Sequence, residues 1–207
     1  MRVMIETRRL KLRQLLVSDH ESLDALIGDA DVMEFSDGSL NSDEAGAWLR
    51  SQIDGYEKNN GIEISAVVKK STSEFIGYCG LTLFPDIDGI AEIEIGYRLI
   101  RKFWGDGFAT EAASAVRDYA FSELKLTRLV ALIEPSNRRS IRVAEKIGMT
   151  YEKDVMLKHY NRPDHLYSLH LWPFALLTLV FVSIGPLLYL VLNTGTENIG
   201  VCEGSGA

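Results

Sequence analysis

Residues 94–112 read EIGYRLIRKFWGDGFATEA, and the fold can be worked out from this stretch. Its beginning belongs to a run, 91–99, in which apolar and polar residues alternate as they do in a half-buried strand. Isoleucine, tyrosine and leucine fall on one face, and Glu92 and Glu94 fall on the other. A turn with two glycines follows, and a helix is predicted over 110–124. The stretch therefore predicts a strand, a glycine-bearing turn and a helix in direct succession.

The turn carries small residues at Gly105, Gly107 and Ala109. Small side chains leave backbone amides uncovered, and a helix N-terminus adds the favourable end of its dipole, so the turn suits a diphosphate. Read alone, such a turn is as often only a tight connection. A Rossmann dinucleotide site is another interpretation, but the third glycine is missing, and no acidic residue follows a second parallel strand about 20 positions on.

The remaining elements are predicted from capping boxes, periodicity and breakers. Ser18 with Glu21 and Asn41 with Glu44 indicate two early helices. Strands are expected over 62–68 and 75–84, with 85–89 closing the second, and over 129–133, 155–160 and 165–171. A further helix is expected to open at Ser136 and Asn137 and to end at Gly148. This order predicts an α+β, or mixed α/β, fold.

Composition excludes several classes of protein. The chain has 207 residues, of which 46% are hydrophobic, and this suits one globular domain. A formal net charge of −7 argues against nucleic-acid binding through phosphate neutralisation. Cys79 and Cys202 lie far apart, so neither a disulfide framework nor a thiolate metal site is indicated. His159, His165 and His170 are unevenly spaced and lack partners for a tetrahedral site, so we expect no metal.

The two ends of the chain suggest different environments. The first residues contain charges and no apolar run, so we expect no signal peptide and a cytoplasmic catalytic domain. Residues 171–192 contain no charge and as a helix would reach about 33 Å, enough to span a bilayer. The basic residues near this run all precede it, which places the domain on the cytoplasmic side. The alternatives are a helix packed on a partner or in a homodimer, and an accidental extension from a shifted reading frame.

The segments EIGYRLIRKFWGDGFATEA (94–112) and EPSNRRSIRVAEKIGM (134–149) together resemble the GNAT superfamily of N-acetyltransferases. The chain looks most like the branch that acetylates the N-terminal alanine or serine of ribosomal proteins. The resemblance covers about residues 5–171. It implies a central mixed, mostly antiparallel sheet flanked by helices, with an extra apolar C-terminal segment. The expected domains are 1–171 for acetyl transfer, 172–192 for the apolar segment and 193–207 for a polar tail.

The resemblance also implies a reaction: the acetyl group of acetyl-CoA passes to a primary amine by direct attack on the thioester, without a metal. We expect a protein N-terminal α-amine as acceptor. A polyamine, amino acid or drug is the first alternative, and a non-catalytic acyl-CoA-binding module is the second. The implied cofactor-binding residues are Ile95, Tyr97, Lys102, Gly105, Gly107, Ala109, Thr110, Asn137 and Ser140. Asp106 departs from the family, which often has a basic or neutral residue there.

Two residues are candidates for catalysis. Glu94 precedes the residues expected to hold pantetheine, and it could act as a base, directly or through a water. The alternative is a polar-face residue like Glu92. Ser140 could hydrogen-bond the departing sulfur, or it could only satisfy free amides at a helix start. Tyr97 and Tyr160 are further candidates for the acid, with packing as the alternative.

Overall fold

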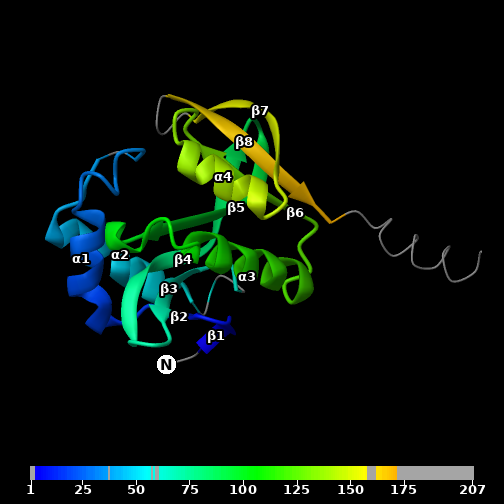
Figure 1. The fold of residues 1–207 in the computed structure, drawn as a ribbon. Helices are drawn as coiled ribbons and strands as arrows, with labels where there is room; N and C mark the ends of the chain where they lie inside the picture. Colours follow the sequence, from blue (N-terminus) through cyan, green and yellow to red (C-terminus); the bar gives the residue numbers. More distant parts are fainter. Residues whose placement is uncertain (1–2, 37, 57, 59–60, 158–161, 172–207) are drawn as a thin grey trace, which may run out of the picture. The chain divides into compact units, whose positions relative to one another are not determined.

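A computed structural model describes residues 3–36, 38–56, 58, 61–157 and 162–171 (Figure 1). These residues form one sheet in the order β1-β2-β3-β4-β5-β6-β8-β7. Every neighbouring pair is antiparallel except β5 and β6. The strands are β1 (Val3–Glu6), β2 (Leu10–Gln14), β3 (Ile64–Lys69), β4 (Glu74–Ile87), β5 (Ile90–Leu99), β6 (Arg128–Ile133), β7 (Thr150–Leu157) and β8 (Arg162–His170). The predicted mixed, mostly antiparallel sheet flanked by helices is confirmed.

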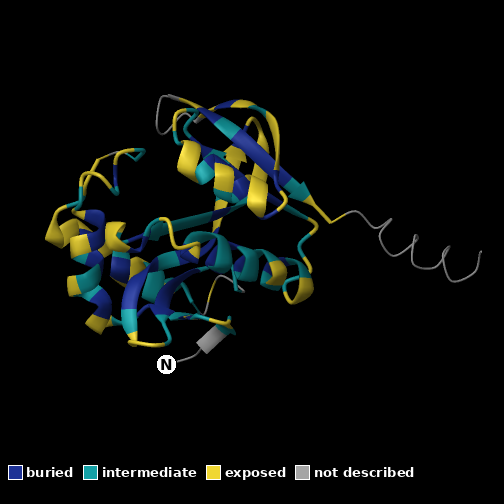
Figure 2. Ribbon diagram, viewed as in Figure 1, coloured by how far each residue is buried: buried dark blue, intermediate teal, exposed yellow. Residues whose placement is uncertain are grey.

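Helices pack on both faces of this sheet. They are α1 (His20–Ile27), α2 (Ser42–Gly55), α3 (Phe108–Ser122) and α4 (Arg138–Lys146). One core packs α3 and α4 against the sheet, and the other packs α1 and α2. β3 gives Val67 to the first core and Ile64 and Ala66 to the second, so it is buried on both faces and does not alternate. Figure 2 shows buried residues concentrated in the strands, with exposed residues on loops and outer helix faces.

The two predicted capping boxes have different outcomes. The box at Asn41 is confirmed: its side chain accepts from the backbone N–H of Glu44 at 3.1 Å, and the Glu44 carboxylate accepts from the N–H of Asn41 at 2.9 Å. The box at Ser18 is wrong, because Ser18 lies in a short 3₁₀ turn, η1 (Val17–Asp19), and α1 begins at His20. Asp19 instead forms a largely buried ion pair with Arg13, at 2.6 Å.

The strand that was expected to close at 85–89 runs further. Pro85 lies inside β4, where the register with β5 shifts between Phe84 and Ile87. Proline donates no ladder hydrogen bond, so an irregularity of this kind is where a strand tolerates it. The reversal comes at Asp88 and Gly89, which both have a positive φ.

The meeting of β5 and β6 positions the site. β5 pairs with β4 from Ile90 to Leu99, whereas its parallel register with β6 consists of Glu94 opposite Val130. Within the described part of the chain, the edge of β5 from 95 to 99 therefore has no strand partner on the β6 side. An extended ligand could add to this edge as a strand does.

Among the described residues, no helix is long and apolar enough to cross a membrane. The predicted segments 172–192 and 193–207 lie outside the described residues, as do His159 and Tyr160.

Candidate active site

A cavity of about 1210 Å³ opens where β5 and β6 separate. Its walls come from β5, α3 and α4, and from the loop between α1 and α2 together with α2 itself. Nine predicted site residues line it: Glu94, Ile95, Tyr97, Gly105, Gly107, Ala109, Thr110, Asn137 and Ser140. Lys102 does not. Its ammonium pairs with Glu74 and lies 4.9 Å from the centroid of the Phe103 ring, because η2 (Arg101–Phe103) turns the side chain away.

The glycine turn owes its composition to backbone conformation. Gly105 and Gly107 have φ of 88° and 79°, in the left-handed region that favours glycine. A Cβ on Gly105 would meet nothing within 4 Å, and one on Gly107 would meet only Arg9, at 3.6 Å. Gly107 is the N-cap of α3 and has no side chain to accept from the first-turn amides. Those amides are therefore available to an anion.

Arg9 holds this turn from outside the cavity. Its guanidinium donates to the backbone carbonyl of Asp106 at 2.9 Å and lies 4.3 Å from the centroid of the Phe108 ring. It also pairs with Glu111 in the first turn of α3 at 2.6 Å. Burial alone would raise the pKa of Glu111, but hydrogen bonds from Thr7 and Arg9 outweigh it and lower the pKa. The carboxylate of Asp106 is exposed and does not line the cavity.

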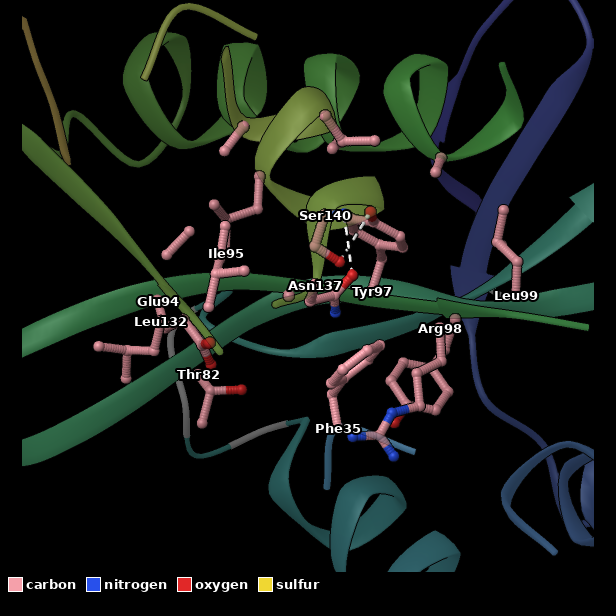
Figure 3. Close-up of a pocket in the computed structure, with 18 of the residues that line it drawn as sticks. Phe35, Thr82, Glu94, Ile95, Tyr97, Arg98, Leu99, Leu132, Asn137 and Ser140 are labelled. Carbon is pink, nitrogen blue, oxygen red and sulfur yellow. Dashed lines mark hydrogen bonds between the residues drawn. The ribbon is translucent and has the colours of Figure 1, made fainter. Parts of the chain in front are cut away.

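Tyr97 of β5 and Ser140 of α4 both line the cavity and contact each other, with their hydroxyl oxygens 3.3 Å apart (Figure 3). Asn137 caps α4 by accepting from the backbone N–H of Ser140 at 3.1 Å. The cap is thus supplied by Asn137, which leaves the Ser140 hydroxyl for Tyr97. Burial raises the pKa of Tyr97 although the hydrogen bond with Ser140 lowers it, so the phenol keeps its proton at neutral pH.

Glu94 lies where β5 and β6 part, and its surroundings alter its acidity. Burial raises its pKa to about 7, against the lowering influence of the Leu132 backbone and Arg98. Glu92, on the same strand face, is buried and paired with Arg128 at 2.9 Å. No lysine or arginine nitrogen of the described residues lies within 4.0 Å of the Glu94 carboxylate. The two glutamates therefore differ: Glu92 is held in a structural ion pair, and Glu94 can exchange a proton near neutral pH.

Beside Glu94, the other half of the cavity contains residues that the sequence did not indicate. Figure 3 shows Glu94, Thr82, Arg98 and Phe35 on one side of β5, opposite Tyr97 and Ser140. Further lining residues on this side are Met33, Ser36, Trp48 and Tyr78. The rings of Trp48 and Tyr78 lie 5.2 Å apart. These residues come from four separate segments, and only the tertiary fold brings them together.

The two described histidines of the last hairpin are engaged with neighbours. His165 contacts Asp154 at 2.6 Å, and His170 contacts Arg128. Within the described ranges, no group of three or more His, Cys, Asp or Glu side chains could hold a metal ion.

Comparison with known proteins decides the family. The model of the acetyltransferase (GNAT) domain matches residues 9–150. The chain is 37% identical to YkkB, an uncharacterized protein of Bacillus subtilis (strain 168), over 78% of this chain and 92% of the relative. The chain belongs to the GNAT acetyltransferase family. The GNAT relative p20 of Bacillus licheniformis, an uncharacterized N-acetyltransferase, is 31% identical over 75% of this chain and 86% of its own length.

Among solved GNAT structures, RimL, a ribosomal α-N-protein acetyltransferase in complex with coenzyme A, superimposes with a TM-score of 0.67. It covers 82% of this chain and 98% of its own, at 17% identity, so this likeness concerns the fold. The resemblance found in residues 94–112 and 134–149 is confirmed, and the chain is an acetyl-CoA-dependent N-acetyltransferase.

Proposed function

We propose that this enzyme acetylates protein N-terminal α-amines. The observation that carries the proposal is Glu94, a carboxyl with a pKa of about 7 beside a cavity large enough for two substrates. An α-amine has a pKa near 8, whereas a lysine amine has one near 10.4. The pKa of Glu94, about 7, is much closer to that of an α-amine than to that of a lysine amine. Transfer of a proton from an α-amine to Glu94 therefore costs less free energy than transfer from a lysine. The RimL neighbour acts on an α-amine, which agrees with this acceptor.

The residues present fit the shape and charge of acetyl-CoA. We assign the diphosphate to the backbone amides of 102–110, with Gly105, Gly107, Ala109 and Thr110 nearest the cavity. The Lys102 side chain has no part in this assignment. The pantetheine arm would lie along the open edge of β5, against main-chain groups of Ile95 and Tyr97. Asn137 and Ser140 would contact the arm from α4.

The proposed reaction is a direct transfer. Glu94 accepts a proton from the acceptor amine, directly or through a water, and the amine nitrogen forms a bond with the thioester carbonyl carbon. The C–S bond then breaks, and the electron pair leaves on sulfur. Ser140 donates a hydrogen bond to the departing sulfur, and Tyr97, whose hydroxyl oxygen lies 3.3 Å from that of Ser140, donates its proton to the sulfur. The nitrogen of the new amide gives its remaining extra proton to water, and Tyr97 regains a proton from water. The Tyr97 hydroxyl is protonated at neutral pH, as this role requires.

The test is an acceptor screen that measures thiol release from acetyl-CoA. Short peptides with a free N-terminus should be acetylated faster than spermidine, free lysine or N-terminally blocked peptides that contain lysine. A preference for polyamines or drugs would replace the proposal with small-molecule acetylation. Binding of acetyl-CoA without turnover on any amine would replace it with a non-catalytic module.

A further inference from the structure

We propose that Arg98 forms a carboxylate-binding subsite, so that preferred peptide acceptors carry an acidic side chain at their second or third residue. The inference rests on the proposed function and narrows its substrate class. It starts from Arg98, which lies in the half of the cavity that also holds Glu94 and that we assign to the acceptor. Arg98 forms no ion pair within the described residues.

The contacts of Arg98 are all with neutral atoms. One terminal nitrogen donates to the sulfur of Met33 and the other to the hydroxyl of Ser36. No carboxylate oxygen of the described residues lies within 4.0 Å of the guanidinium, whereas the neighbouring Arg101 pairs with Asp31. Arg98 is half-buried and lines the cavity. A partly desolvated cation is costly unless an anion meets it, and a guanidinium matches a carboxylate in shape.

The position of Arg98 on β5 sets the length of the acceptor. Every second residue of β5 lies on the same face, and this face carries Glu94, Gly96 and Arg98. At a rise of about 3.3 Å per residue, the Cα atoms of Glu94 and Arg98 are about 13 Å apart. A Cβ on Gly96 would meet only the Glu94 carboxylate, at 3.7 Å, so the space between the two charged residues is open. An extended peptide with its amine at Glu94 passes over Gly96 and brings its second or third residue to Arg98.

The charges along this path are ordered. Glu94 stands at the amine end, and Asp164 lies close enough to raise its pKa further. Arg98 stands at the other end, and Phe35 also lines the cavity on this side of β5 (Figure 3). A peptide that carries an amine at its start and a carboxylate further along matches this order. A peptide with a basic residue at the same position meets Arg98 with like charge.

The test uses the full-length wild-type enzyme and C-terminally amidated peptides. Three peptides share the sequence Ala-Ala-X-Ala and carry Glu, Gln or Lys at X, and a second set places X at the second residue. Because a hydrogen bond to a charged group contributes about 1.5–3 kcal/mol, kcat/KM should be roughly ten- to hundredfold higher for Glu than for Gln in at least one set. Lys should be poorer than Gln. Free glutamate and Ala-Ala with an unblocked C-terminus are assayed as further acceptors. They show whether Arg98 binds the carboxylate of a small acceptor or an acidic side chain of a peptide.

Variants of Arg98 test whether this residue binds the acceptor carboxylate or only supports the loop that contains Met33. Arg98→Gln should remove the preference for Glu mainly through KM, Arg98→Lys should keep part of it, and Arg98→Glu should reverse it toward Lys. Arg8→Gln, an exposed arginine that does not line the cavity, is the matched control and should keep the wild-type ratio. Equal wild-type rates with Glu and Gln, or an unchanged ratio in Arg98→Gln, would overturn the subsite and leave the function standing. No turnover on any amine would overturn both.

Discussion

Replacing Glu94 with glutamine should separate the chemistry of this residue from its position. The amide keeps the size of the side chain but cannot accept the proton. Since general-base catalysis contributes about 10²- to 10⁴-fold, we expect kcat to fall about a hundredfold at pH 7 with little change in acetyl-CoA affinity. In the wild type, kcat/KM should rise with pH through about 7 as Glu94 ionises. The variant should lose this ionisation, and its deficit should shrink above pH 8 as the amine loses its proton unaided.

The same substitution has a consequence for stability, with a definite sign. The pKa of Glu94 is about 7 in the folded protein, against an ordinary value of 4.5. A raised carboxyl pKa means that the folded state disfavours the ionised form, so this destabilisation is absent below pH 4.5, grows up to pH 7 and is complete above it. At about 1.4 kcal/mol per pH unit, the full effect is at most about 3.5 kcal/mol. The Glu94→Gln variant should therefore be more stable than the wild type at about pH 8 and equal to it at about pH 4.

Two measurements check this reasoning: thiol-release kinetics from about pH 6 to 9.5, and urea unfolding at about pH 4 and 8. Glu92→Gln is the control, because Glu92 pairs with Arg128 and lies outside the cavity. It should lose stability and keep the wild-type shape of the pH–rate profile. A loss of rate in Glu94→Gln that is the same at every pH would refute the base role. A stability difference that does not change with pH would refute the raised pKa.

Three further predictions concern the cofactor turn and the tail. Gly107→Asn, which tolerates the left-handed φ of 79° better than a β-branched residue, should raise the KM for acetyl-CoA at least about tenfold with the fold intact; an unchanged KM would place the phosphates elsewhere. Arg9→Ala should raise the same KM about three- to tenfold and leave kcat near wild type. Adding Glu111→Gln should lower this KM again in part, because the carboxylate that Arg9 neutralises is then gone. Steady-state kinetics with acetyl-CoA as the varied substrate checks both. If the uncharged run 171–192 is a membrane anchor, and not a segment packed on a partner or an accidental extension, the full chain should sediment with membranes and a chain ending at residue 171 should not; a full chain that is monodisperse without detergent would contradict the anchor.

The sequence predicted best where the signal was local. The strand, turn and helix of 94–112 were predicted because alternation, glycines and helical periodicity follow one another without a gap. β1 and β2 were missed because they are short and lie among charged residues, although Leu10 and Leu12 are fully buried. Lys102 was expected at the cofactor because the motif contains it, yet a 3₁₀ turn sends its side chain to Glu74. A motif fixes the position of the backbone more firmly than the direction of an exposed side chain.

The half of the cavity that we assign to the acceptor could not be predicted, because strand alternation and long-range packing together assemble its residues. Along β5, Ile95 and Tyr97 face α3 and α4, while Glu94 and Arg98 lie on the opposite side of the strand, where Arg98 contacts the loop between α1 and α2. In the proposed assignment one strand serves two substrates, with odd positions toward the cofactor path and even positions toward the acceptor. A slip of one residue would exchange the two sets.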